Sequence, residues 1–351
     1  MLLPVGDSHV AISLQPVVAG FIFGRGGIEM KRKWNVFVTR MLPEPAINYL
    51  KEYCEVEINP EDRVLSKAEL VAAVKGRDAV LSQLTDIIDD AVFEAAGPQC
   101  KVFANYAVGY NNVDLEAAAR RGIMITNTPD VLTDATADLA WTLLFATARR
   151  VVEADDFLRK GKYQGWGPML LLGVEITGKT LGVIGTGRIG QNFAAKAKAF
   201  SMKILYNDIN RNLDFEKATG AVYADKETLL READFVSLHV PLLPATRHLI
   251  GAPEFHIMKN TAILINTSRG PVVNETELVA ALKTGEIWGA GLDVFENEPE
   301  LAPGLAELTN VVILPHVASA TVETRINMGV VAARNIVAAM QGEVPPNLVN
   351  R

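Results

Sequence analysis

The sequence predicts an α/β protein built from two doubly wound parallel sheets. From about residue 34, short β-branched runs alternate with helical stretches, which is typical of βαβ units. At 185–190 a glycine-rich turn follows one of these runs directly and opens a helix. The length of 351 residues is sufficient for two domains, each with its own core.

Composition excludes several classes of protein. The net charge of −7 argues against a nucleic-acid partner, because phosphate binding requires a basic face. Asp138 interrupts the most apolar stretch, so no run reaches the roughly 18 residues that a membrane span needs. The two cysteines, Cys54 and Cys100, lie far apart without a CxxC pattern. We therefore expect no metal site, no disulfide framework, no membrane and a cytoplasmic protein.

The first 29 residues show no pattern of a folded element. They lack a basic start, carry Asp7, and contain proline and glycine that break the apolar pattern, which makes them a poor secretory signal. We expect residues 1–29 to be a non-native or disordered extension outside the fold.

The first half of the chain alternates strands and helices. A helix is predicted over 47–54, another begins at Ser66, whose capping box is completed by Glu69, and a third ends at Gly122. An Ala-rich stretch, 134–160, is predicted to be one long helix that forms a hinge. The predicted strands are "NVFVT" (35–39), "VEI" (56–58), "DAVLS" (78–82), "KVFANY" (101–106) and "IMITNT" (123–128).

The second half repeats the alternation and ends with a helix. No strand follows the helix predicted over 320–342, so we expect it to pack against the first half of the chain. This assigns 30–128 and 317–351 to one domain and 129–316 to the other. The predicted strands are "TLGVIG" (180–185), "MKILYND" (202–208), "AVYA" (221–224), "DFVSLHV" (234–240), "AILINTS" (262–268), "WGAGLDV" (288–294) and "VVILP" (311–315).

The glycine-rich turn indicates a dinucleotide site. Gly185 permits a tight turn, Gly187 lets the backbone approach a pyrophosphate, and Gly190 lets helix and strand pack closely. The phosphates then lie at the helix N-terminus, where free N–H groups favour an anion. The next strand ends at Asp208, the position expected to bind the adenosine ribose. A purely structural turn is the alternative, and the complete strand–turn–helix context disfavours it.

Three chemically active side chains follow strands of the same half. Ligands bind at the carboxyl ends of strands in doubly wound sheets, and Arg269, Glu298 and His316 all follow strand ends there. Each alone reads more simply as a turn residue, a solvated acid or a buried histidine. Together they suit hydride transfer, because arginine can bind a 2-keto acid's carboxylate and polarise its carbonyl. Histidine can protonate the oxygen, and a carboxylate can keep the imidazolium charged.

From about Met30 to Arg351 the chain resembles the D-isomer-specific 2-hydroxyacid dehydrogenase family, in its glyoxylate/hydroxypyruvate reductase branch. The matching motifs are "VGYNNVDL" (108–115), "NTPDVLTDATADLAW" (127–141), "LGVIGTGRIGQ" (181–191), "HVPLLPAT" (239–246), "INTSRGPVVNE" (265–275), "GLDVFENEP" (291–299) and "LPHVASAT" (314–321). The resemblance implies a Rossmann cofactor domain inserted in a flavodoxin-like substrate domain. It also implies that Arg269, Glu298 and His316 form the catalytic set.

The resemblance further implies binding residues around that set. Backbone amides of Ala107, Val108 and Gly109 are expected to bind the substrate carboxylate, together with Arg269. Asn111 and Ala318 depart from the family pattern of Asp and Gly, and we expect neither to touch the catalytic set. The residues expected at the cofactor are Gly185, Gly187, Arg188, Ile189, Gly190, Asp208, Val240, Pro241, Thr267 and Asp293, the last on the nicotinamide carboxamide.

The predicted reaction is NAD(P)H-dependent reduction of glyoxylate to glycolate or of hydroxypyruvate to D-glycerate. NADH is expected over NADPH, because the charge of Asp208 would repel a 2′-phosphate. The alternatives are a phosphoglycerate dehydrogenase, another D-2-hydroxyacid dehydrogenase and an NAD-sensing corepressor; the absence of an extension after "PPNLVNR" disfavours the first. A homodimer is expected through the 134–160 helix, whose Trp141, Leu143 and Leu144 are too apolar for a solvated surface, although they could instead pack in their own domain. Trp166 is expected to reach the partner's substrate pocket.

Overall fold

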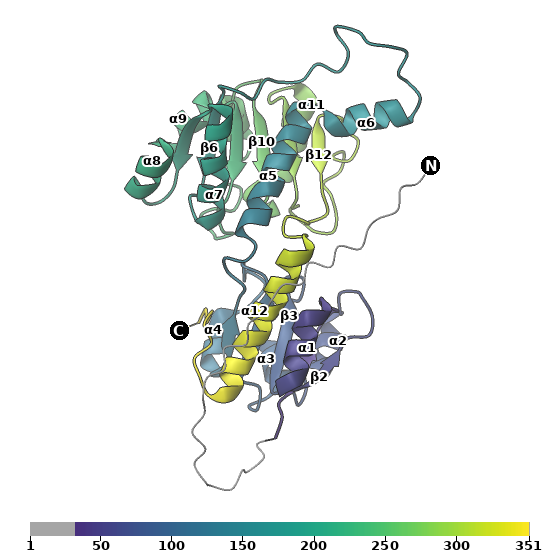
Figure 1. The fold of residues 1–351 in the computed structure, drawn as a ribbon, viewed down its shortest axis with the longest axis vertical. Coiled ribbons are helices and arrows are strands. Elements are labelled where there is room, and N and C mark those ends of the chain that lie inside the picture. The colour runs from purple at the N-terminus through teal and green to yellow at the C-terminus, as the bar shows by residue number, and fades with distance from the viewer. Residues whose placement is uncertain (1–31, 351) are drawn as a thin grey trace, which may run out of the picture. The chain divides into compact units, whose positions relative to one another are not determined.

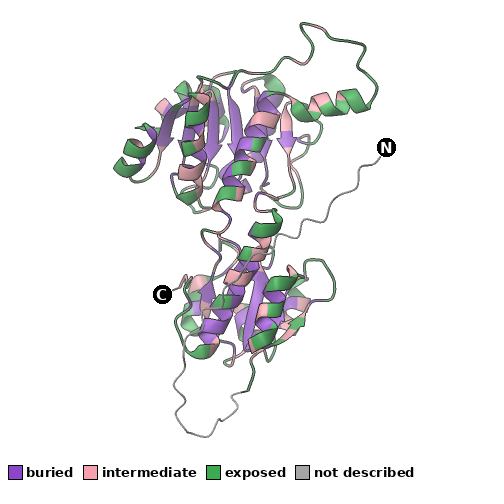
Figure 2. Ribbon diagram, viewed as in Figure 1, coloured by how far each residue is buried: buried purple, intermediate pink, exposed green. Residues whose placement is uncertain are grey.

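The computed structural model describes residues 32–350, so the expectations for residues 1–29 lie outside the described part of the chain. Two parallel sheets form its framework, of five and seven strands (Figure 1). This confirms the predicted α/β class with two doubly wound sheets. Buried residues concentrate in the strands and in the helix faces that cover them (Figure 2).

The first sheet has the strand order β2-β1-β3-β4-β5, with every pair parallel. This is the flavodoxin-like order, whose switch point lies between β1 and β3. The strands are β1 (Asn35–Val38), β2 (Glu55–Ile58), β3 (Ala79–Gln83), β4 (Val102–Tyr106) and β5 (Met124–Thr126). The connecting helices are α1 (Glu44–Tyr53), α2 (Lys67–Ala73), α3 (Asp90–Ala96) and α4 (Leu115–Arg120).

The C-terminal helix packs on this first sheet, as the sequence predicted. Helix α12 (Val322–Gln341) lies beside α1, and its Met328, Ala332 and Ile336 share a core cluster with strands β1, β3 and β4 (Figure 1). The opposite face is covered by α2, α3 and α4 through a second cluster. Helix α2 begins with the predicted capping box between Ser66 and Glu69. Residues from both ends of the described chain therefore form the core on this face of the first sheet.

The second sheet has the order β12-β11-β10-β9-β6-β7-β8, also parallel throughout. The chain reverses its strand order between β6 and β9, so the ligand crevice is expected at their carboxyl ends. The strands are β6 (Thr180–Ile184), β7 (Lys203–Asn207), β8 (Val222–Tyr223), β9 (Phe235–Leu238), β10 (Ile263–Asn266), β11 (Gly289–Leu292) and β12 (Val311–Ile313). The helical elements are α7 (Arg188–Lys196), η1 (Ala197–Phe200), α8 (Leu213–Thr219), α9 (Lys226–Glu232), α10 (Ala252–Ile257), η2 (Gly270–Val272) and α11 (Glu275–Thr284).

The predicted single helix over 134–160 is wrong. The stretch forms two helices, α5 (Thr133–Ala148) and α6 (Val151–Arg159), separated by Arg150 in a left-handed conformation with φ of 52°. Helix α5 packs on the second sheet, whereas α6 buries none of its residues. The sequence has neither glycine nor proline at the break, so composition alone did not mark the turn.

The apolar side chains that suggested a dimer surface on α5 belong to the core of their own sheet. Trp141, Leu143 and Leu144 are buried there, and the Trp141 ring stacks on Phe193 with 4.9 Å between ring centroids. Trp141 also donates from Nε1 to the Phe193 carbonyl at 2.9 Å. These three residues therefore provide no support for a dimer. Across residues 32–350, no helix is both long and apolar enough to cross a membrane.

Candidate active site

The glycine turn has the geometry that the sequence predicted. Gly185 has a φ of 89°, and a Cβ there would lie 2.7 Å from the carbonyl oxygen of His239. A Cβ on Gly190 would lie 2.1 Å from the Gly185 carbonyl oxygen, so only glycine allows α7 to pack this closely on β6. Gly187, by contrast, faces open space at the N-terminus of α7. This leaves room for a pyrophosphate beside the free amides, including those of Arg188 and Ile189.

Asp208 lies just after β7, next to this turn. Its Oδ2 accepts hydrogen bonds from the Thr186 amide at 2.6 Å and the Thr186 hydroxyl at 2.9 Å, while Oδ1 accepts from the Ile209 amide at 2.7 Å. Arg211 is turned toward Glu216, to which Nε and Nη2 donate at 2.7 and 2.9 Å. The carboxylate therefore lies beside the glycine turn, and the arginine of its own loop is paired elsewhere.

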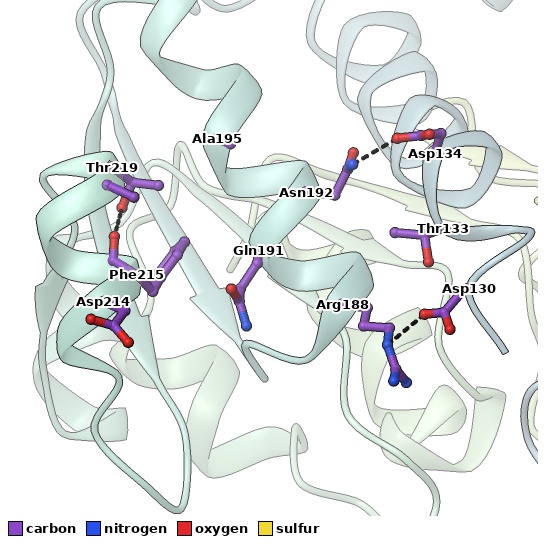
Figure 3. A pocket seen from close by; sticks show the side chains of 11 residues that line it. Asp130, Thr133, Asp134, Arg188, Gln191, Asn192, Ala195, Asp214, Phe215 and Thr219 are labelled. Atoms are coloured by element: carbon purple, nitrogen blue, oxygen red, sulfur yellow. Dashed lines mark hydrogen bonds and ion pairs between the residues drawn. The ribbon is translucent and has the colours of Figure 1, made fainter.

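A surface hollow of about 650 Å³ lies on the other side of α7, between the starts of α5 and α8 (Figure 3). The Arg188 side chain extends there to an ion pair with Asp130 at 2.5 Å, as Figure 3 shows. Two more carboxylates, Asp134 and Asp214, line the hollow, so its lining is negative. This hollow contains none of the predicted catalytic residues and does not suit a phosphate. Arg188 is thus available to a cofactor through its backbone amide.

Arg269 follows β10 and reaches the loop that follows β4. Its Nη1 donates to the Ser268 carbonyl at 2.7 Å, and its Nε donates to Oδ1 of Asn111 at 3.0 Å. A Cβ on Gly109 would lie 1.9 Å from Nη2 of Arg269, so the guanidinium packs directly on that glycine. Burial lowers the pKa of Arg269 below its ordinary value, and the nearby charge of Glu298 partly offsets this. The arginine remains a cation with two nitrogens, Nε and Nη2, directed at the loop after β4.

The expectation that Asn111 does not touch the catalytic set is therefore wrong. Its side chain is a direct partner of Arg269, although 158 positions separate the two. The amide of Ala318 donates to Asp293, which is not a member of the predicted catalytic set. Local sequence showed Asn111 only as a departure from a motif, and its partner became visible only with the two loops folded together.

His316 and Glu298 form a hydrogen-bonded pair. Nδ1 of His316 donates to Oε2 of Glu298 at 2.9 Å, because a carboxylate can only accept. The other glutamate oxygen, Oε1, accepts from the Phe295 amide at 3.0 Å, which fixes the carboxyl plane. Burial raises the pKa of Glu298, but the hydrogen bond and charge of His316, the Phe295 amide and the charge of Arg269 outweigh it, so the pKa lies below its ordinary value. Glu298 is thus an anion that orients the ring and leaves Nε2 for chemistry.

Asp293 determines where the His316 loop runs. It is fully buried after β11, and its two oxygens accept from the amides of Val317 at 2.8 Å and Ala318 at 2.7 Å. His316 itself has a φ of 54°, a left-handed conformation that a side chain rarely adopts unless its surroundings impose it. Burial raises the pKa of Asp293, and the two amides and the charge of His316 partly offset this. The sequence suggested only a cofactor contact for Asp293, and no sequence signal indicated this loop contact.

The other strand-end histidine cannot serve as an acid. His239 is half-buried, its Nε2 lies 2.9 Å from the Ser237 hydroxyl, and burial lowers its pKa to about 3. It is therefore neutral at physiological pH. Of the two histidines that follow strands of the second sheet at this edge, His316 alone has a carboxylate partner in the described structure.

The remaining predicted residues also lie at this edge. Val240 and Pro241 follow β9, and a Cβ on Gly185 would lie 2.8 Å from Cγ1 of Val240. Thr267 follows β10, and its hydroxyl oxygen is buried without a hydrogen-bond partner among residues 32–350. An unsatisfied buried hydroxyl is costly, so a polar group of a bound ligand would satisfy it. The open space at Gly187 and this hydroxyl both fit a dinucleotide, and no cluster of metal ligands occurs in the described residues.

The loop after β4 offers amides to an anion. The amide of Ala107 is already used, because it donates to the Asn105 carbonyl at 2.8 Å. The amides of Val108 and Gly109 have no acceptor within the described chain. Only two of the three predicted amides are therefore free, and both lie in the loop that packs against Arg269.

Comparisons with known proteins show which family the chain resembles. The family model for "D-isomer specific 2-hydroxyacid dehydrogenase, NAD binding domain" matches residues 141–318. A glyoxylate reductase of Thermococcus litoralis is 50% identical over 323 residues, which cover 91% of this chain and 97% of that protein. A crystal structure of a Thermus thermophilus protein is 45% identical with a TM-score of 0.85, and the match covers 90% of this chain and 99% of that one. An NADPH-dependent glyoxylate/hydroxypyruvate reductase of Sinorhizobium meliloti, solved with NADP and malonate, is 31% identical with a TM-score of 0.79 over 90% and 97% of the two chains.

A glycine turn at the switch point of one parallel sheet, beside an Arg–Glu–His set, defines an NAD(P)-dependent oxidoreductase. The chain belongs to the D-isomer specific 2-hydroxyacid dehydrogenase family.

Proposed function

We propose that this enzyme reduces a small 2-keto acid with NAD(P)H, converting glyoxylate to glycolate and hydroxypyruvate to D-glycerate. The observation that carries the proposal is the His316–Glu298 pair, placed at the same sheet edge as Arg269 and the glycine turn. The names of the relatives from Thermococcus litoralis and Sinorhizobium meliloti support glyoxylate and hydroxypyruvate as substrates.

Each catalytic side chain has a role that its contacts allow. Reduced nicotinamide, when bound, supplies the hydride to the carbonyl carbon. Arg269 binds the keto acid and polarises its carbonyl, because its guanidinium faces the loop that bears the free amides. His316 delivers a proton from Nε2 to the carbonyl oxygen, while Glu298 holds the ring through Nδ1 and balances its charge. These three side chains thus supply substrate binding, carbonyl polarisation and the proton.

The substrate and the cofactor are assigned to different sheets. We propose that the part built on the first sheet, 30–128 with 317–351, binds the substrate carboxylate at Val108 and Gly109. The part over 129–316 binds NAD(P) at the glycine turn, with Val240, Pro241, Thr267 and Asp293 around the nicotinamide. The family match over 141–318 supports the second assignment, because its printed description is an NAD-binding domain.

NADH is proposed as the preferred cofactor, with NADPH as a weaker one. Asp208 can accept from both ribose hydroxyls, and its charge would oppose a 2′-phosphate. The pairing of Arg211 with Glu216 supports this preference, since it holds the arginine of the same loop on another partner. A relative from Sinorhizobium meliloti is described as NADPH-dependent, so cofactor preference differs within the family.

A homodimer in the cytoplasm completes the proposal. Support for the dimer comes from the segment after α5, where large apolar side chains are exposed although α5 itself is buried. The exposed fraction is 83% for Trp166, 77% for Met169 and 61% for Leu158. Sedimentation velocity at micromolar concentration tests the dimer. A monomer would also contradict the expectation that Trp166 reaches the substrate pocket of a partner subunit. The two free, buried cysteines support a reducing compartment.

The testing experiment is oxidation of NADH and NADPH with four keto acids: glyoxylate, hydroxypyruvate, pyruvate and phosphohydroxypyruvate. Turnover that is fastest with glyoxylate or hydroxypyruvate is the expected result. Fastest turnover with phosphohydroxypyruvate would favour a phosphoglycerate dehydrogenase. Cofactor binding without turnover on any substrate would indicate a binding protein.

A further inference from the structure

The three carbonyls of the loop Ala107–Gly109 are all held by donors from the protein. The Ala107 carbonyl accepts from the Thr128 amide at 2.9 Å. The Val108 carbonyl accepts from Nδ2 of Asn127 at 2.8 Å, and the Gly109 carbonyl accepts from Nδ2 of Asn105 at 3.1 Å. A trans peptide unit is planar, with its carbonyl and its N–H pointing in opposite directions. Fixing the carbonyls of Ala107 and Val108 therefore fixes the direction of the N–H groups of Val108 and Gly109.

Asn105 is itself locked in place. It is fully buried on β4, and its side-chain amide pairs with that of Asn112 through two 3.2 Å hydrogen bonds. Asn112 in turn donates to the carbonyls of Gln83 at 3.1 Å and Asp86 at 2.9 Å. The donor that holds the Gly109 carbonyl is thus anchored to the end of β3.

Asn127 is anchored from a different direction. Its carbonyl accepts from Nδ2 of Asn335 at 3.2 Å, and its amide donates to the Asn347 carbonyl at 3.3 Å. Asn335 is fully buried on α12, and its Oδ1 accepts from the Asn347 amide at 3.2 Å. The C-terminal helix therefore sets the position of the donor that holds the Val108 carbonyl.

We infer that Asn127 and Asn105 are positioning residues that set the affinity for the substrate carboxylate. Asn127 fixes the peptide plane that carries the Gly109 N–H, and Asn105 keeps the Gly109 carbonyl oxygen directed away from the anion. The inference rests on the proposed function, in which this loop binds the carboxylate. An anion is attracted to N–H groups and repelled by carbonyl oxygens, so the loop binds it only while both asparagines direct the carbonyls into the protein. Asparagine suits this role because its Nδ2 donates without bringing a charge near the anion.

The test is Asn127→Asp and Asn105→Asp, each of which replaces the donor by an oxygen of nearly the same shape. Losing the partner of a buried group costs about 1–3 kcal/mol, so the KM for glyoxylate should rise about 5- to 150-fold. Because neither side chain touches the reacting atoms, kcat should stay within about threefold of the wild type. Asn48→Asp is the matched control: it adds the same charge to an exposed position on α1 and should leave KM unchanged.

A second measurement separates the inference from the proposed function. The dissociation constant of oxalate, a dicarboxylate probe, is measured by tryptophan fluorescence with NAD⁺ present. Weaker oxalate binding by Asn127→Asp than by Asn48→Asp supports the inference. Equal oxalate affinity in the two variants, or a fall in kcat with KM unchanged, overturns it. If Asn105→Asp fails to fold, Asn127→Asp carries the test, since Asn127 is only partly buried. Wild-type enzyme that binds oxalate but reduces neither glyoxylate nor hydroxypyruvate would instead overturn the proposed function alone.

Discussion

Replacing Asp293 by asparagine tests whether the buried carboxylate controls the His316 loop. The substitution keeps the shape of the side chain but exchanges one accepting oxygen for a donor. That donor would face the amide of Val317 or Ala318, whose hydrogen bonds to Asp293 are 2.8 and 2.7 Å long. A hydrogen bond to a charged group contributes about 1.5–3 kcal/mol. Removing a buried charge offsets part of this loss, since burial already raises the pKa of Asp293.

The expected net loss is about 1–2 kcal/mol of unfolding free energy, which lowers the melting temperature by roughly 2–8 °C. The substitution should affect kcat more strongly than it affects stability. The two amides belong to the residues just after His316, and a misplacement of about 1 Å in a catalytic group can cost on the order of 100-fold in rate. We therefore expect kcat to fall by about 10- to 100-fold.

The assay combines kcat with the dissociation constant of NADH, measured by fluorescence. A fall in kcat with a smaller change in NADH affinity indicates that Asp293 acts chiefly through the loop. Asp234→Asn is the matched control, because Oδ2 of Asp234 accepts from the Thr180 amide at 2.9 Å but lies at the opposite edge of the same sheet. The control should lose stability and keep its kcat. A kcat for Asp293→Asn within threefold of the wild type would refute the reasoning.

Three further substitutions test other parts of the site. His316→Asn should lower kcat by about two to four orders of magnitude and leave NADH binding nearly intact, and comparable turnover would remove His316 from the mechanism. Asp208→Ser should raise kcat/KM for NADPH and lower it for NADH, because two like charges about 4 Å apart repel by roughly 1–4 kcal/mol; a wild type that already prefers NADPH would contradict this. Glu275→Gln should be more stable than the wild type at pH 8 by thermal melting. Burial raises the pKa of Glu275, and the charges of Glu296 and Glu298 raise it further, while the amides of Glu296 and Ala302 partly offset this. Because the folded state favours the protonated carboxyl, the wild type loses stability as pH rises through that pKa. The difference should vanish toward pH 4, and an equal difference at both pH values would disprove the assignment.

The sequence alone was sufficient for the two sheets and for the glycine turn. Both are encoded locally. Short β-branched runs that alternate with helical stretches indicate the strands. Only glycine tolerates a φ of 89° at position 185, and a Cβ on Gly190 would lie 2.1 Å from the Gly185 carbonyl oxygen. The polar side chains Arg269, Glu298 and His316 were selected by their places after predicted strands, because the carboxyl ends of parallel strands meet at one edge. The bond between His316 and Glu298 agrees with that selection.

Tertiary structure decided what depends on contacts between distant segments. Arg269 meets Asn111 only because the loop after β10 comes against the loop after β4, and no local pattern encodes a pairing over 158 positions. Trp141 is apolar enough for either a dimer surface or a core, and only its packing on Phe193 distinguishes the two. Ala107 fits the motif as well as Val108 and Gly109 do, yet its amide already donates to the Asn105 carbonyl. Hydrophobic periodicity specifies which face of a helix or strand is buried. Which residues of a distant segment pack against that face is decided only when the whole chain is folded.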